Sequence, residues 1–261
     1  MILGQTNSRE KLHRRKSSFI LIVGERGSGK KTILRETYGD SAYWVPDISV
    51  DSIRTMIKEA YKVHDTMFII ADADNMSLTA KNALLKVVEE CPNNNWFIMT
   101  LQDANNTLET IRSRAEILYV DLYTEEELNE YYLHKYANKE TAEKLYVCST
   151  PGEVDIFEKQ GGIEFYEYVE TVVDCIDEVS LANALKIGNS VALKDEEDKY
   201  DLKLFWKIFI NICFERKYKY WIYVTNKALQ QLRITGINKQ MLFTAWILKI
   251  RDDYGSSEGQ G

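Results

Sequence analysis

The sequence has few of the residues that mark linkers and metal sites. Only three of its 261 residues are proline and 13 are glycine, which argues against long disordered linkers. Its four cysteines, Cys91, Cys148, Cys175 and Cys213, lie far apart and form no C-x-x-C pair. This spacing predicts reduced thiols, and neither a zinc site nor a disulfide framework.

Long apolar runs are also missing. A membrane-spanning helix needs about 20 mostly apolar residues, and the sequence contains no such stretch. The N-terminus lacks the apolar core and small-residue cleavage site of a secretory signal. We therefore expect a cytoplasmic protein without membrane contacts.

Acidic residues outnumber basic ones, but unevenly along the chain. The net charge of −7 disfavours a continuous DNA-coating surface. Residues 1–35 contain nine Lys or Arg and two Glu, so they carry +7 and the remainder carries −14. The basic segment is compatible with phosphate binding, and equally with an ordinary solvated surface.

Apolar runs alternate with helical patterns over residues 1–122. Strands are expected at 19–23, 43–46, 67–71, 96–100 and 116–120, and helices at 31–38, 52–61 and 79–90. This alternation predicts an α/β domain with a parallel sheet between helices.

Beyond residue 122 only helical patterns remain. Thr124–Glu127 fits a capping box, Asn138 can cap a second helix, and Thr150–Glu153 combines a cap with a proline at the first helical position. We expect three short helices over 123–162 and a helical domain over 163–254. A disordered polar tail is expected over 255–261.

Aromatic residues are dense in this last helical domain. The later helices are expected at 164–178, 181–187, 202–218, 221–233 and 239–254. The aromatic residues in question are Phe205, Trp206, Phe209, Phe214, Trp221 and Trp246. Core packing accounts for most of them, and a partner-facing surface is the alternative.

A glycine-rich segment follows the first expected strand. Gly24–Lys31 fits the phosphate-loop pattern G-x-x-x-x-G-K-[S/T] at every fixed position but the last. In such loops the backbone N–H groups face a phosphate, and a lysine, here Lys30, reaches the terminal phosphates. A turn without a ligand is the alternative. The candidate nucleotide-binding residues are Gly24, Gly27, Ser28, Gly29, Lys30, Lys31, Thr32 and, from a later strand end, Asp72.

Two positions that would hold a magnesium ion are altered. Lys31 stands where a Ser or Thr hydroxyl would coordinate the metal, and Thr32 comes one residue too late, since a helix turns about 100° per residue. After the strand at 67–71, Ala71 replaces the metal-binding aspartate and Asp72 the catalytic glutamate. We expect no magnesium site and no significant ATP hydrolysis. ATP binding without turnover stays open.

Six segments follow one another along the chain in a characteristic order: Gly4-Gln5, Gly24–Lys31, Val50–Arg54, Asp72–Ser77, Asn82–Glu90 and Thr110–Arg114. In this order they resemble the clamp-loader subunits of the AAA+ ATPases, most of all the delta-prime type of bacterial DNA polymerase III. The resemblance implies an AAA+ domain over 1–122, a three-helix lid over 123–162 and a helical collar over 163–254. By position it gives Arg114 the role of an arginine finger that completes a neighbouring subunit's ATP site.

The resemblance also implies partners: other clamp-loader subunits, the sliding clamp, and primed DNA through the assembled complex. Departures concern the chain's own site. Leu101 stands at the polar sensor position after the strand at 96–100, the lid segment has no arginine at Thr150–Glu153, and the family's zinc module is absent. Two alternatives stay open: an active ATPase using Asp72 or Asp74 as metal ligand, and a stand-alone regulatory scaffold.

Overall fold

The computed structural model divides the chain into two compact units. It describes residues 5–14, 16–136, 139–176, 178, 180–192, 200–232, 234 and 236–257. The first unit is Met1–Glu127 with Thr150–Gly152, and the second is Leu128–Ser149 with Glu153–Gly261. Gly4, Asn138 and the last four residues of the predicted tail lie outside the described residues, so the expectations placed on them have no structural counterpart here.

The first unit is built on a five-stranded parallel sheet with the order β2-β3-β4-β1-β5. The strands are β1 (Phe19–Val23), β2 (Ala42–Trp44), β3 (Met67–Ile70), β4 (Trp96–Leu101) and β5 (Glu116–Tyr119). β1, β3 and most of β4 are buried throughout, as expected of parallel strands covered on both faces. The predicted α/β sheet is therefore confirmed.

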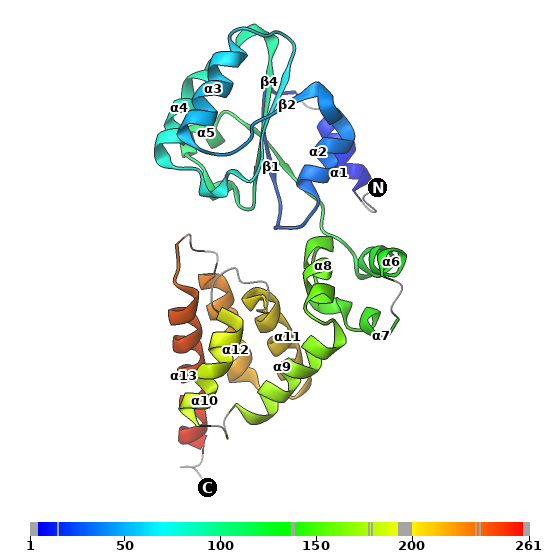
Figure 1. Ribbon diagram of the computed structural model, residues 1–261, viewed down its shortest axis with the longest axis vertical. Coiled ribbons are helices and arrows are strands. Elements are labelled where there is room, and N and C mark those ends of the chain that lie inside the picture. Colours follow the sequence, from blue (N-terminus) through cyan, green and yellow to red (C-terminus); the bar gives the residue numbers. More distant parts are fainter. Residues whose placement is uncertain are drawn as a thin grey trace. The chain divides into compact units, whose positions relative to one another are not determined.

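Helices cover both faces of this sheet (Figure 1). They are α1 (Thr6–His13), α2 (Lys30–Tyr38), α3 (Val50–Ala60), α4 (Leu78–Glu90) and α5 (Glu109–Arg112). One apolar core joins the sheet to α3, α4 and α5, and a second joins it to α1 and α2. Short 3-10 turns lie at Gly39–Ser41, Ala73–Asn75, Pro92–Asn94, Ala104–Asn106 and Leu145–Val147.

Only helices and short turns follow β5 among the described residues. They are α6 (Glu125–Lys135), α7 (Lys139–Ala142), α8 (Pro151–Lys159), α9 (Ile163–Cys175), α10 (Leu181–Ala192), α11 (Leu202–Glu215), α12 (Lys219–Gln231) and α13 (Lys239–Ser257). The capping box before α6 is present: the Thr124 N–H donates to Glu127 at 2.9 Å, and the Glu127 N–H donates to the Thr124 hydroxyl at 3.2 Å. α13 continues to Ser257, so the first three residues of the predicted disordered tail are helical instead.

Aromatic side chains form much of the core of the second unit. Of the six singled out in the sequence, only Phe214 is exposed, and the other five are buried. The rings of Trp206 and Trp246, for example, lie 5.6 Å apart between centroids. Core packing therefore accounts for nearly all of them. The division of this helical part at residue 162 stays a prediction.

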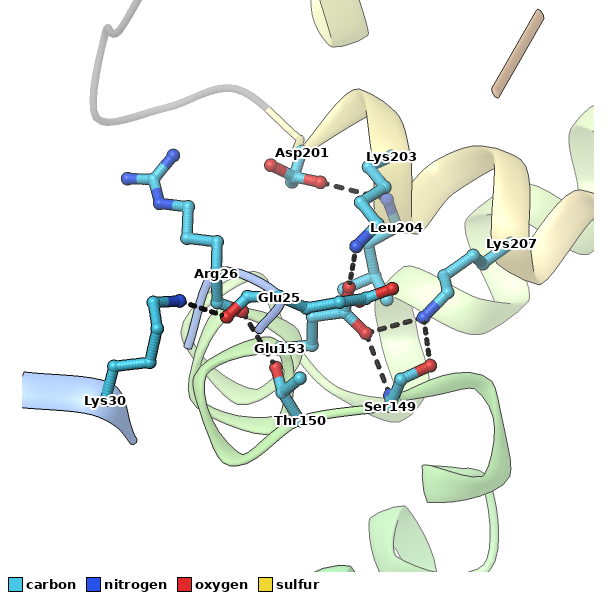
Figure 2. A network of polar contacts seen from close by, with 10 residues as sticks. All are labelled: Glu25, Arg26, Lys30, Ser149, Thr150, Glu153, Asp201, Lys203, Leu204 and Lys207. Atoms are coloured by element: carbon cyan, nitrogen blue, oxygen red, sulfur yellow. Dashed lines mark hydrogen bonds and ion pairs between the residues drawn. The ribbon is translucent and has the colours of Figure 1, made fainter. Parts of the chain in front are cut away.

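A buried carboxylate ties α8 to α11 (Figure 2). Glu153, with 8% of its side chain exposed, pairs with Lys203 at 2.7 Å and with Lys207 at 2.6 Å. It also accepts the Ser149 N–H at 2.8 Å. Burial is the largest influence on Glu153 and opposes its ionisation, but the two lysines outweigh it and lower its pKa. No helix among the described residues is long and apolar enough to cross a membrane.

Candidate functional site

The glycine-rich loop connects β1 to α2 and has the backbone shape that its sequence predicts. Gly27 and Gly29 have φ angles of +80° and +85°, a region that glycine adopts without strain. The buried ammonium of Lys30 donates to the carbonyls of Gly24 at 2.6 Å and Glu25 at 2.8 Å. Burial lowers the pKa of Lys30, although nearby carboxylates act in the opposite direction. Lys30 is thus held inside the loop by backbone carbonyls.

The tip of the loop contacts a segment far away in the sequence. The Gly152 N–H donates to the Gly27 carbonyl at 3.1 Å. The Thr150 hydroxyl donates to the Arg26 carbonyl at 3.2 Å, a contact drawn in Figure 2. A Cβ built on Gly152 would lie 2.4 Å from the Cα of Gly27. Both positions therefore require glycine. The sequence pattern marks Thr150–Glu153 as a helix start and as the lid position without an arginine, but it does not predict this contact.

Lys31 and Asp72 are brought together as an ion pair. Asp72 follows β3 with a φ of +53°, and its N–H donates to the buried Thr100 hydroxyl at 2.8 Å. Asp74, by contrast, accepts the Gln102 N–H at 2.7 Å at the end of β4. Lys31, at the altered hydroxyl position, and Asp72, at the place of the catalytic glutamate, thus neutralise each other. Within the described ranges, no group of three or more His, Cys, Asp or Glu is placed to hold a metal ion.

An open cleft of about 640 Å³ adjoins this ion pair. Its lining consists of Lys31, Arg35, Gly39, Asp40, Trp44, Val45, Pro46 and Ala71. The Arg35 guanidinium lies over the Trp44 ring, 5.4 Å from its centroid. The volume falls in the range of small-molecule sites. Thr32 lies on an exposed part of α2 and is not among the residues that line the cleft.

Arg114 lies in the turn between α5 and β5, away from the phosphate loop in the sequence. Its guanidinium donates to the Thr110 carbonyl at 2.8 Å and pairs with Glu89, at the end of α4, at 2.9 Å. The side chain remains 42% exposed. Glu89 belongs to the helix segment Asn82–Glu90, but its pairing with Arg114 was not predicted. An acidic residue at the end of a neighbouring helix could have suggested it.

Comparison with known proteins supports part of the sequence interpretation. Residues 37–123 match the family described as DNA polymerase III, delta subunit. Over this segment the chain is DNA polymerase III delta-subunit-like. The matched segment contains Asp72 and Arg114, but it starts after the phosphate loop. No curated protein sequence matches the chain significantly.

Solved structures resemble most of the chain at low sequence identity. The replication initiator DnaA, bound to AMPPCP and single-stranded DNA, has 14% identity and a TM-score of 0.51, covering 88% of this chain and 95% of that one. This likeness shows an AAA+-like fold. A gamma-subunit-related DNA polymerase III protein from Thermotoga maritima has 15% identity, a TM-score of 0.49, and coverage of 94% and 98%. The RuvB branch migration motor from Thermotoga maritima has 17% identity, a TM-score of 0.46, and coverage of 82% and 77%.

Proposed function

We propose that this chain is a clamp-loader subunit of the delta-prime type. In this role it joins other clamp-loader subunits, helps to load the sliding clamp onto primed DNA, and lends Arg114 to a neighbouring subunit's ATP site. Its own phosphate loop does not support ATP turnover. Residues 123–162 then act as the lid, and residues 163–254 as the collar through which the subunits assemble.

The exposure of Arg114 and its side-chain contacts are the observation that carries this proposal. A finger acting in another subunit must be exposed, yet it must be held in place before the neighbour arrives, because fixing a long side chain costs conformational entropy. Arg114 is 42% exposed, and its contacts with the Thr110 carbonyl and Glu89 favour one direction of its side chain. A guanidinium is always charged and offers a planar fork of donors that suits phosphate oxygens. The family match over residues 37–123 includes this arginine.

The residues around the chain's own phosphate loop support the proposed lack of ATP turnover. Phosphoryl transfer depends on a divalent cation to offset charge in the transition state. Here Lys31 and Asp72 pair with each other. Ala71 stands in the place of the metal-binding aspartate and offers no ligand. An ATPase that used Asp74 instead would have to redirect a carboxylate that already accepts from Gln102 and Asn106.

Reconstitution tests the proposal. The chain is mixed with ATP-hydrolysing clamp-loader subunits and the clamp from the same source, and clamp loading onto primed DNA is measured with and without it. We expect a stable complex and loading that requires the chain. A complex that loads the clamp equally well without the chain would contradict the proposal. Metal-dependent ATP turnover by the isolated chain, at about 1 s⁻¹ or faster, would favour the active ATPase instead.

A further inference from the structure

We propose that the Lys31 ammonium takes the place of the magnesium ion, so that the loop binds the phosphate chain of a nucleoside triphosphate without a divalent cation. This inference rests on the proposed non-hydrolysing state of the chain's own loop. It adds the ligand form that the loop accepts: the metal-free nucleotide.

The residues at the expected metal position do not fit magnesium. Mg²⁺ prefers oxygen ligands in octahedral geometry. Lys31 offers a cation instead of an oxygen, Ala71 offers no ligand, and the Asp72 carboxylate already pairs with Lys31. A magnesium ion would therefore meet a positive charge and would compete with it for the one carboxylate at this position.

The Lys31 ammonium can offset the negative charge of the phosphates in place of the metal. In a magnesium site the cation lies between a protein carboxylate and the phosphate oxygens. An ammonium has three N–H donors, so one contact with Asp72 leaves two donors for phosphate. The pair is solvent-accessible, with 48% of the Lys31 side chain and 61% of the Asp72 side chain exposed. Exposed pairs of this kind contribute little stability, so an anion can share the ammonium easily.

Lys31 and Arg35 are the basic residues of the cleft lining, which also contains one acidic residue, Asp40. Arg35 has no carboxylate partner among the described residues. Lys30 begins α2 directly after the loop, and the N-terminal end of this helix carries a partial positive charge. Together these groups suit a phosphate chain, and the Trp44 ring gives the cleft an aromatic wall.

A second observation within the loop points to a ligand. The Ser28 hydroxyl is buried, with 5% of the residue exposed, and it has no hydrogen-bond partner within the described residues. It lies against the first glycine of the loop, since a Cβ on Gly24 would be 2.9 Å from this hydroxyl. A buried hydroxyl without a partner is costly, and a phosphate oxygen in the loop would supply an acceptor.

Calorimetric titration of the full chain with ATP tests this inference. The titration is run once with excess EDTA and once with excess Mg²⁺. We expect binding in EDTA, with a dissociation constant no more than about threefold weaker than in Mg²⁺, a difference of well under 1.4 kcal/mol. Trp44 fluorescence gives a second signal, because this residue lines the cleft.

Two variants with opposite expected effects on ATP binding make the test specific. Lys31→Thr should weaken binding in EDTA by about tenfold or more, the loss expected for one charge-assisted contact. Asp72→Asn should leave binding in EDTA equal or tighter, because it frees the ammonium. Lys86→Thr, at an exposed lysine of α4, serves as the matched control and should change nothing.

Three results would overturn the inference: no ATP binding in either buffer, binding that requires Mg²⁺, or unchanged EDTA binding in Lys31→Thr. None of them touches the proposed role of Arg114, which is measured by clamp loading and by turnover in a neighbour's site. Conversely, a chain that binds metal-free ATP but joins no clamp loader would contradict only the proposed function.

Discussion

Replacing Glu153 by glutamine should destabilise the second unit by about 2 kcal/mol at neutral pH. The change keeps the shape of the side chain but removes its charge. Breaking a buried ion pair costs about 3–5 kcal/mol. The cost is smaller here because Lys203 and Lys207, with 39% and 21% of their side chains exposed, can turn toward water. Glutamine also retains one acceptor for the Ser149 N–H.

Urea unfolding, followed by tryptophan fluorescence, measures this loss. The pKa of Glu153 is lowered in the folded state, so its stabilising effect is complete above the ordinary value of 4.5 and is lost as the pH falls through the lower, folded value. The difference between wild type and Glu153→Gln should therefore shrink in acid. Glu167→Gln, on an exposed part of α9, is the control and should stay within about 0.5 kcal/mol. A Glu153→Gln loss below about 0.5 kcal/mol at pH 7, or one that does not shrink in acid, would refute the reasoning.

Two further substitutions test contacts of the first unit. Gly152→Ala should lower the stability of the first unit by about 1–3 kcal/mol, because the added Cβ would lie 2.4 Å from the Gly27 Cα. Thermal unfolding measures this loss. An unchanged melting temperature would rule the contact out. Asn95→Ala should lower the free energy of unfolding by about 2–4 kcal/mol, because buried Asn95 donates to the carbonyls of Ala60 at 2.8 Å and Val63 at 3.1 Å. Urea unfolding should show this loss. A change under about 1 kcal/mol would argue against the role of these hydrogen bonds.

The sheet of the first unit was predictable because buried parallel strands are continuous apolar runs. Small errors at the ends have local causes. β2 is Ala42–Trp44 instead of 43–46, and the proline at position 46 cannot donate to a ladder. α1 was not predicted. Among its described side chains only Ser8 and Leu12 are buried, so it shows little apolar periodicity.

The candidate site was only partly predictable. The loop and Arg114 follow from local sequence patterns, whereas their contacts join residues far apart in the chain. The sequence identified Lys31 and the segment Ala71-Asp72 as two separate defects. The ion pair between Lys31 and Asp72 could have been expected, because the carboxyl ends of parallel strands meet at one edge of a sheet. The contact of Gly152 with Gly27 has no such local signal, since nothing near either glycine specifies its partner.

The role of Arg114 in a neighbour's site is tested most directly by ATP turnover in the reconstituted complex. Arg114→Ala should lower turnover by about 10³-fold or more while the complex still assembles. Arg112→Ala, at the arginine that ends α5, is the matched control and should leave turnover close to wild type. An assembled complex that keeps wild-type turnover with Arg114→Ala would contradict the account.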